Sequence, residues 1–336
     1  MKTPVFSSRF IKDNCEEIRL SQLLTNEGVD DSRMRLTRRH YYEACLCEVA
    51  VVHAAVVEDV AGPALLMPMF LHDNHLSYFS MPAAPVFAKR LNERERIEAL
   101  TTACFMVIDY CVKAGIGLTI ERFQTCSQSQ RLTDWEVKLL QTGGRKFDTY
   151  HGYVALELGE AGILSQIRKS YRSLINWGRR EMQMIFVHSG FPDVQLFESF
   201  RLFHLQVAGR ATRPLDSWSV MFDLIKEGRA ILGLGYFDGE LVAATYMFCH
   251  GGFALYGTGV YDRNRFDKPI SHWPLFATLV KAYECGALLC DIGELFPSPV
   301  VSNKERNIAF FKKGFTGYVV DESYWRIEAD TSKALL

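Results

Sequence analysis

Residues 229–257 read RAILGLGYFDGELVAATYMFCHGGFALYG, a segment in which apolar runs alternate with turn residues. It contains three apolar runs, separated by Asp238-Gly239 and by a His-Gly-Gly turn at 250–252. An Asp-Gly pair between two apolar runs is a strong signal for a two-residue hairpin turn. The pattern therefore predicts three consecutive antiparallel strands.

The residues that follow predict a helix and then another strand. A loop containing Pro269 leads into a helical pattern at 271–285, and Gly286 is placed to end that helix. Residues 287–292 form the next apolar run and are expected to be a strand. Three antiparallel strands, a crossover helix and a further strand together make a mixed α+β unit.

The same order occurs in the first half of the chain. Three strand-like runs occupy residues 48–79, a helix with apolar residues at spacings of three and four covers 93–114, and Gly115 precedes a strand at 117–120. Because the turns, the helix end and the strand recur in one order, we expect a duplicated fold. Each copy is predicted to be a mixed, largely antiparallel sheet flanked by helices.

The predicted domains are residues 1–150 and residues 151–336. Just after this boundary, residues 159–183 show an amphipathic pattern with one basic face. Two more helices are expected at 192–207 and 215–226, the second of them preceded by a proline.

The charge balance excludes one class of function. The 336 residues include 38 Lys and Arg against 39 Asp and Glu, a net charge of −1. A dedicated nucleic-acid-binding protein needs clustered Lys and Arg to neutralise phosphates.

No apolar run approaches the ~20 residues that span a bilayer, and the first residues lack the pattern of a secretory signal. We expect a soluble, cytoplasmic protein, and a homodimer stays open.

The cysteines favour a structural role. There are nine, no Cys-x-x-Cys pair occurs, and Cys and His never stand at the spacing of metal ligands. Reduced thiols in apolar strand and helix patterns behave as small hydrophobic residues. We therefore expect no metal site.

No common catalytic motif is present, but the order of elements resembles a known family. The sequence has no Gly-x-Ser-x-Gly, no P-loop and no His-Glu-x-x-His. Its duplicated order resembles the tandem GNAT arrangement of the FemAB-like acyltransferases over about residues 40–325. Three segments carry the resemblance: IRKSYRSLINWGRR at 167–180, LFHLQVAGRATRPLDSWSVMFDLI at 202–225, and CDIGELF…IAFFKKGFTG within 290–317.

The resemblance implies an acyl-CoA-dependent N-acyltransferase. The group includes enzymes that acylate the amino group of a nucleotide-linked deoxyamino sugar, such as a dTDP-linked one, for bacterial surface polysaccharides such as lipopolysaccharide or capsule. The amine would attack the thioester directly, because no Cys or Ser in the sequence has a triad setting. The expected partners are acyl-CoA as co-substrate and the nucleotide sugar, with no nucleic acid.

Two other functions stay open at this point. The peptidoglycan branch of the group takes an aminoacyl group from tRNA, but the balanced charge and the lack of a long charged arm between 183 and 226 oppose it. A non-catalytic binding module on a degenerate GNAT pair is favoured by the missing pyrophosphate loop and opposed by the polar residues of the second half. The loop MPAAPV at 81–86 offers nothing to hold phosphates, so we expect the first domain to be structural.

The acyl-CoA phosphates are expected at the helix that begins near Ser271. Ordinary GNAT enzymes carry Arg/Gln-x-x-Gly-x-Gly/Ala before this helix, whereas residues 262–269 here read DRNRFDKP. A helix N-terminus still favours anions through its free N–H groups and its dipole. Arg263, Arg265 and Lys268 are placed to supplement it.

Three residues near the expected acyl site are candidates for acid–base catalysis. An N-acyltransferase needs a base or a water relay, because the amine must be neutral when it attacks. His272 is a candidate base or substrate contact, and a surface residue at a helix cap is the alternative. Asp291 and Glu294 flank the strand that lines the acyl site in the resembled fold, although a carboxylate at a strand end is often only solvated.

The acceptor-binding candidates are basic and polar residues on two helices and a loop. Arg210 and Arg213 stand in a short Gly- and Pro-bounded loop, and arginine forks suit bidentate contacts with phosphate. Lys312 matches the lysine of the family's closing motif. The basic helix face contributes the remaining candidates, unless it is simply solvated: Tyr171, Arg172 and Asn176.

Overall fold

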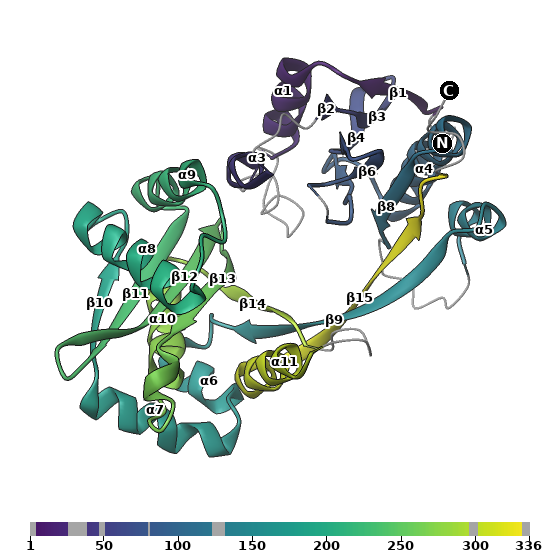
Figure 1. Ribbon diagram of the computed structural model, residues 1–336. Helices are drawn as coiled ribbons and strands as arrows, with labels where there is room; N and C mark the ends of the chain where they lie inside the picture. The colour runs from purple at the N-terminus through teal and green to yellow at the C-terminus, as the bar shows by residue number, and fades with distance from the viewer. Residues whose placement is uncertain are drawn as a thin grey trace. The chain divides into compact units, whose positions relative to one another are not determined.

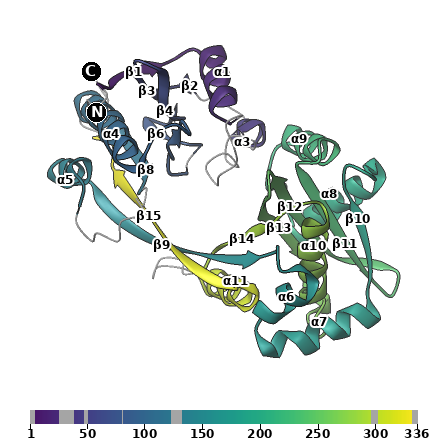
Figure 2. The ribbon, with the colours of Figure 1, turned by 180° about the vertical axis from the view of Figure 1, so that it is seen from behind.

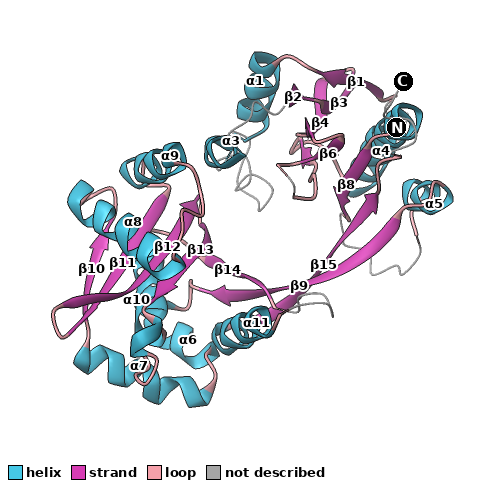
Figure 3. Ribbon diagram, in the orientation of Figure 1, coloured by secondary structure: helices cyan, strands magenta, loops and turns pink. Residues whose placement is uncertain are grey.

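The chain forms two compact units, each built from separate parts of the sequence (Figures 1 and 2). The computed structural model describes residues 5–25, 39–46, 51–79, 81–122, 132–295 and 302–330. Unit 1 comprises residues 1–36, 48–148 and 322–336. Unit 2 comprises residues 37–47 and 149–321. Both units combine sheets with helices, which confirms the predicted α+β class (Figure 3).

Unit 2 is built on strands in the order β10-β11-β12-β13-β14-β9. Neighbouring strands are antiparallel, except that β13 and β14 run parallel. The strands are β9 (Arg145–Ala155), β10 (Gln183–Val187), β11 (Ala230–Phe237), β12 (Glu240–His250), β13 (Phe253–Tyr261) and β14 (Leu289–Glu294).

The three strands expected at 229–257 are β11, β12 and β13, and residues with positive φ form the turns between them. Asp238 and Gly239, the two residues between β11 and β12, have φ of 53° and 78°. Gly251 and Gly252, between β12 and β13, have φ of 55° and 88°. Two successive positive φ values define the type I′ hairpin, whose twist matches that of the strands. The prediction of this meander is confirmed.

Helices cover both faces of the unit 2 sheet (Figure 1). Tyr246 of β12 donates a hydrogen bond to the Met221 carbonyl of α9 and stacks near Phe200 of α8. The next residue, Met247, lies in a buried cluster with Leu275 of α10. Successive strand residues point to opposite faces, so α8 and α9 cover one face and α10 the other. The helical segments are α3 (Arg39–Leu46), α6 (Gly159–Gln166), α7 (Lys169–Glu181), α8 (Val194–Ala208), α9 (Leu215–Lys226), η1 (Arg263–Arg265), α10 (His272–Glu284) and α11 (Asn303–Phe315).

The helices expected at 192–207, 215–226 and 271–285 are present as α8, α9 and α10. The strand expected at 287–292 begins two residues later, because the chain first closes the end of α10. Gly286 has φ 94°, and the Ala287 N–H donates to the Ala282 carbonyl at 2.9 Å. These bonds hold residue 287 in the helix cap rather than in the sheet.

Unit 1 departs from a simple copy of this plan. The three runs within 48–79 were expected to form one meander, and that expectation is wrong. β3 and β4 pair in one sheet, of order β1-β3-β4-β7, whereas β5 and β6 belong to a different sheet, in which the strands of this unit follow the order β15-β8-β6-β5-β2. Pro68 follows β4 directly, and a proline has no N–H for a sheet ladder. The strands are β1 (Ser7–Ile11), β2 (Val51–Val52), β3 (Ala54–Asp59), β4 (Gly62–Met67), β5 (Phe70–His72), β6 (His75–Ser77), β7 (Val86–Phe87), β8 (Gly117–Glu121) and β15 (Tyr318–Ile327).

The crossover of the repeat is nevertheless present in unit 1. β6 and β8 run parallel, and the intervening helix is α4 (Glu93–Ala114). Asn92 and Glu95 form a capping box at its start, and Gly115, with φ 69°, ends it as predicted. The other helices among the described residues of this unit are α1 (Asn14–Thr25) and α5 (Asp134–Gln141). Within the described residues, no helix is both long and apolar enough to cross a bilayer.

The contact between α7 and α11 suggests a first test of the packing. A Cβ on Gly314 of α11 would overlap the Tyr171 ring, which is itself packed by His272 at 4.5 Å between ring centroids. Overpacking costs about 1–3 kcal/mol, more than the roughly 0.5–1 kcal/mol that alanine gains over glycine in a helix. Gly314→Ala should therefore lower the free energy of unfolding, measured by urea titration.

Lys313→Ala, at the exposed position beside it, provides the matched control. Surface substitutions usually change stability by less than about 0.5 kcal/mol. A Gly314→Ala protein as stable as the wild type would contradict the close contact between these helices.

Candidate active site

The candidate site lies where β13 and β14 stop pairing. Their parallel ladder joins only residues 253–255 to residues 289–291. β13 continues to Tyr261 and β14 to Glu294, each paired beyond this point with its other neighbour. In open sheets, ligands bind outside the carboxyl ends of strands where neighbouring strands part. Three helices, α7, α10 and α11, send side chains to this end.

An aromatic cluster ties those helices together. The ring of Tyr171 from α7 meets that of His272, the first residue of α10, edge to face at 4.5 Å. Phe311 and Phe315 of α11 lie 5.4 and 6.1 Å from His272. Phe311 also reaches Tyr261 at the end of β13, with centroids 6.1 Å apart. The structure thus brings two predicted site residues, Tyr171 and His272, into direct contact.

The aromatic surroundings keep His272 neutral. Burial lowers the pKa of His272 to about 4, and a hydrogen bond with the Pro269 backbone opposes the shift. Its Nδ1 lies 3.4 Å from the hydroxyl of Ser271. A group with a pKa of about 4 is a weak base at neutral pH. The geometry therefore favours a packing or hydrogen-bonding role for His272, and a catalytic role stays a prediction.

Asp291 is held rigidly on β14. Its side chain accepts a hydrogen bond from the Gly293 N–H at 2.6 Å, and one from His151 Nδ1 at 3.1 Å. Gly293 has φ 90° and lies at an irregularity in the β14–β9 register. This backbone conformation turns the Gly293 N–H towards the Asp291 carboxylate. Asp291 is only 8% exposed. Because a carboxylate only accepts hydrogen bonds, His151 must donate through Nδ1.

Lys312 of α11 faces the same strand end. A Cβ added to Gly293 would lie 2.7 Å from Lys312 Nζ, which places the ammonium group against the β14 backbone. Burial lowers the pKa of Lys312, while Asp291 and Glu294 act in the opposite direction. No ion pair within the described residues joins Lys312 to either carboxylate, and Glu294 is exposed. The structure therefore brings Lys312, Asp291 and Glu294 together, with a cation in half-buried surroundings.

The segment expected to hold phosphates bonds largely to itself. The backbone N–H groups of Arg265, Lys268 and Ile270 donate to carbonyls within the segment. The side chains are also engaged: Arg265 pairs with Glu240 at 2.7 Å, and Lys268 lies 3.5 Å from Asp267.

Ser271 is the N-cap of α10, but its side chain makes no capping hydrogen bond. The side chain of Arg263 is exposed. The cap and Arg263 are the parts of this segment that remain able to meet an anion.

The remaining acceptor candidates are not gathered at this end. Arg172 donates to the Ser165 carbonyl at 3.0 Å, and its Nε is buried without a partner. Asn176 is exposed on α7. Arg210 and Arg213 lie on the α8–α9 side of the sheet, where both line a cavity described below.

His151 was not predicted from the sequence. It contacts Asp291 across 140 residues of chain, from β9 to β14. A single histidine in a polar stretch gives no local signal, and only the strand order makes the two neighbours. The aromatic residues Phe311 and Phe315 stand in the family-like closing segment, but their contact with His272 depends equally on tertiary packing.

Other chemistry finds little support in the described residues. No group of three or more His, Cys, Asp or Glu side chains there is arranged to hold a metal ion. Cys290 precedes Asp291, and burial raises the pKa of its thiol well above the ordinary value. A thiol of this kind is a poor nucleophile.

Comparisons with known proteins show the fold. No protein-family model and no curated protein sequence matches the chain. A crystal structure of FemX is similar with a TM-score of 0.63 and 13% identity, covering 95% of this chain and 96% of that one. The C-terminal domain of a lysylphosphatidylglycerol synthetase of Agrobacterium fabrum has a TM-score of 0.57 and 13% identity, covering 96% and 95%.

A third similar structure is a tandem GNAT protein from the clavulanic acid biosynthesis pathway. Its TM-score is 0.52 at 12% identity, with 96% of this chain and 98% of that chain covered. At these identities the likeness concerns the fold alone. The protein therefore has the tandem GNAT-like fold that its element order predicted.

The neutral state of His272 predicts a pH dependence of stability. Its pKa is lowered in the folded state, so its contribution is complete above the unfolded value of about 6.5 and is lost as pH falls toward 4. His272→Gln should remove this acid sensitivity. We expect wild type to lose on the order of 3 kcal/mol more than the variant between pH 7 and pH 4, in urea titrations at each pH. Equal losses would show that His272 is solvated.

Proposed function

We propose that the protein is an N-acyltransferase whose reaction takes place in unit 2, at the carboxyl ends of β13 and β14. The observation that carries the proposal is Lys312. Its ammonium group is drawn out of water and held against the β14 backbone, beside the rigid carboxylate of Asp291. A fixed positive charge in a partly dehydrated place suits a reaction that creates an oxyanion.

The proposed reaction is direct acyl transfer. A neutral amine attacks the acyl carbonyl carbon, a C–N bond forms, and the carbonyl oxygen becomes an oxyanion opposite Lys312. When the tetrahedral intermediate collapses, the bond to the leaving group breaks. The proton lost by the attacking amine passes, directly or through water, to the Asp291–His151 pair and then to the leaving group. No covalent intermediate on the enzyme is needed, in keeping with the raised pKa of Cys290.

The donor in this proposal is acyl-CoA. Its phosphates would meet the N-terminus of α10 at Ser271, together with Arg263, and with Arg265 and Lys268 if these exchange their present partners. The acceptor would be the amino group of a nucleotide-linked deoxyamino sugar. Unit 1 would then serve as structure, with the chemistry in unit 2.

A second donor is favoured by one observation. The segment before α10 uses its own N–H groups internally, and Pro274, the third residue of α10, has none to offer. Such a segment offers few N–H groups to bind the diphosphate of acyl-CoA. An aminoacyl ester on tRNA does not depend on a diphosphate site at this helix. Aminoacyl transfer is therefore the second candidate, with the same chemistry at Lys312.

The two donors can be separated directly. Wild-type protein is incubated with acetyl-CoA or with aminoacyl-tRNA, each with a dTDP-linked amino sugar, and amide formation is followed by mass spectrometry. We expect the amide only with the thioester. Product from the tRNA ester alone would replace the first donor by the second, and product from neither, across a panel of amine acceptors, would contradict the proposed function.

Lys312 can be tested against its neighbour on α11. Lys312→Met removes the charge but keeps an unbranched apolar chain. The loss of one oxyanion-stabilising group costs about 10²–10³ in kcat, and we expect a loss of this size with an unchanged or raised Tm. Lys313→Met is the matched control, because Lys313 is exposed and should leave kcat unaltered. Equal rates in the two variants would remove Lys312 from the reaction.

A further inference from the structure

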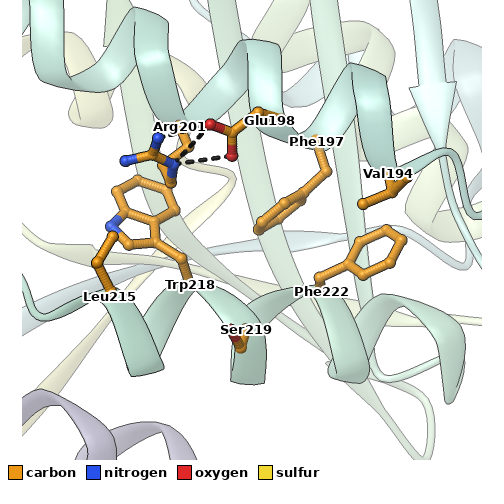
Figure 4. Close-up of a pocket in the computed structure, with 8 residues that line it drawn as sticks. All are labelled: Val194, Phe197, Glu198, Arg201, Leu215, Trp218, Ser219 and Phe222. Atoms are coloured by element: carbon orange, nitrogen blue, oxygen red, sulfur yellow. Dashed lines mark hydrogen bonds and ion pairs between the residues drawn. The ribbon is translucent and has the colours of Figure 1, made fainter.

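Helices α8 and α9 leave a groove between them, on the sheet face opposite α10. Its volume is about 360 Å³. Each helix contributes four residues at spacings of three, one and three, which is one face of an α-helix. The rings of Phe197, Trp218 and Phe222 lie between the two helices (Figure 4). The lining residues are Val194, Phe197, Glu198 and Arg201 from α8, and Leu215, Trp218, Ser219 and Phe222 from α9.

The floor of the groove is aromatic, and its rim combines two exposed apolar residues with the Glu198–Arg201 ion pair and Ser219. The Phe197 ring lies 5.1 Å from Phe222 and 6.3 Å from Trp218. Val194 is 59% exposed and Leu215 70% exposed. The aromatic rings of the two helices pack against each other below the groove, whereas Val194 and Leu215 above them stay exposed to water. A bound apolar group would complete the packing.

A second cavity of about 240 Å³ adjoins the groove and is cationic. The two cavities share Arg201, Leu215 and Trp218. The second is further lined by Arg210, Arg213 and His204, and none of its lining residues is an Asp or Glu. Glu198, in the first cavity, pairs with Arg201. Arg210 and Arg213 therefore give the second cavity a net positive charge that no lining carboxylate balances.

Arg213 is held in place by an aromatic ring and a hydroxyl group. Its guanidinium lies 4.8 Å from the Trp218 ring centroid, and Nη1 donates to the Tyr41 hydroxyl at 3.0 Å. Burial, and then the charge of Arg213, lower the pKa of His204. Arg210 is exposed on the same loop, and no ion pair to it is found in the described residues. A positioned cation with a neutral histidine and a second arginine nearby is a ready receptor for an anion.

We propose that the two cavities together bind an amphiphilic anion. Its apolar chain would lie in the α8–α9 groove, and its phosphate or carboxylate would meet Arg210 and Arg213. The volume of the groove falls in the range of about 300–1,000 Å³ typical of small-molecule sites. Neither cavity is lined by Lys312 or Asp291, so the proposal stands or falls independently of the proposed function.

Calorimetry with defined probes tests the ligand class. The probes are decyl phosphate and decanoate below their micelle concentrations, with inorganic phosphate and decanol as the separate halves. We expect either decyl anion to bind at least about tenfold more tightly than each half, since one charged hydrogen bond already accounts for a factor of this order. The stronger of the two anions identifies the head group.

Two variants locate the binding. Ser219 is exposed in the groove, so Ser219→Trp should fill it without disturbing the core, and we expect binding of decyl phosphate to be lost. Arg210→Ala should weaken binding about tenfold and reduce its dependence on salt. Arg180→Ala, an exposed arginine on α7, is the matched control and should bind as wild type does. Circular dichroism verifies that each variant is folded.

Three results would overturn the proposal. The first is binding of decyl phosphate that is equally strong in Ser219→Trp. The second is decanol binding as tightly as decyl phosphate, which would leave the arginines without a role. The third is a response to phosphatidylglycerol vesicles and not to dissolved amphiphile, which would indicate a membrane-docking surface instead.

Discussion

The early end of the β13–β14 ladder is the constraint on which the candidate site depends. β14 is also paired with β9 on its other edge, and that ladder has an irregularity between Asp291 and Gly293. β13 is bent in its turn by Gly257, which has no partner in the β12 register. A bulged strand bends away from its neighbour. The resulting strand end is where α7, α10 and α11 converge, so the backbone decides which side chains can meet.

At this strand end, burial disfavours the charged forms of His272 and Lys312, and nearby carboxylates act in the opposite direction on Lys312. The aromatic rings that bury His272 also keep it uncharged, and the same dehydration weakens the hold of Lys312 on its proton. Asp291 and Glu294 offset part of that cost for the lysine. A cation that is held by structure rather than by a close ion pair keeps its charge available for a substrate oxygen. The arrangement is a reasonable one for acyl transfer.

The sheet of unit 2 gives the protein two chemically different faces. On one side, Met247 and its neighbours pack under α10 and lead to the Lys312 end. On the other, Tyr246 anchors α9 by a hydrogen bond to Met221, and residues of α8 and α9 line the groove. Arg210 and Arg213 belong to this second face. Their pairing in one short loop made them look like acceptor-site residues, but the strand alternation at 246 and 247 sends the two sets of residues apart.

The sequence by itself determined the local elements of this protein. Asp238-Gly239 and the Gly-Gly pair at 251–252 specify their hairpins, because only such residues accept two positive φ values in succession. Asn92 and Gly115 likewise mark the ends of α4. The order of these elements was enough to predict the tandem fold, and the family resemblance made Asp291, Glu294 and Lys312 site candidates. The tertiary structure alone decided that Pro68 divides unit 1 into two sheets, that His151 meets Asp291, and that His272 is buried among aromatic rings. Turns and caps are governed by neighbouring dihedrals, whereas strand order and burial depend on contacts between residues far apart in the chain.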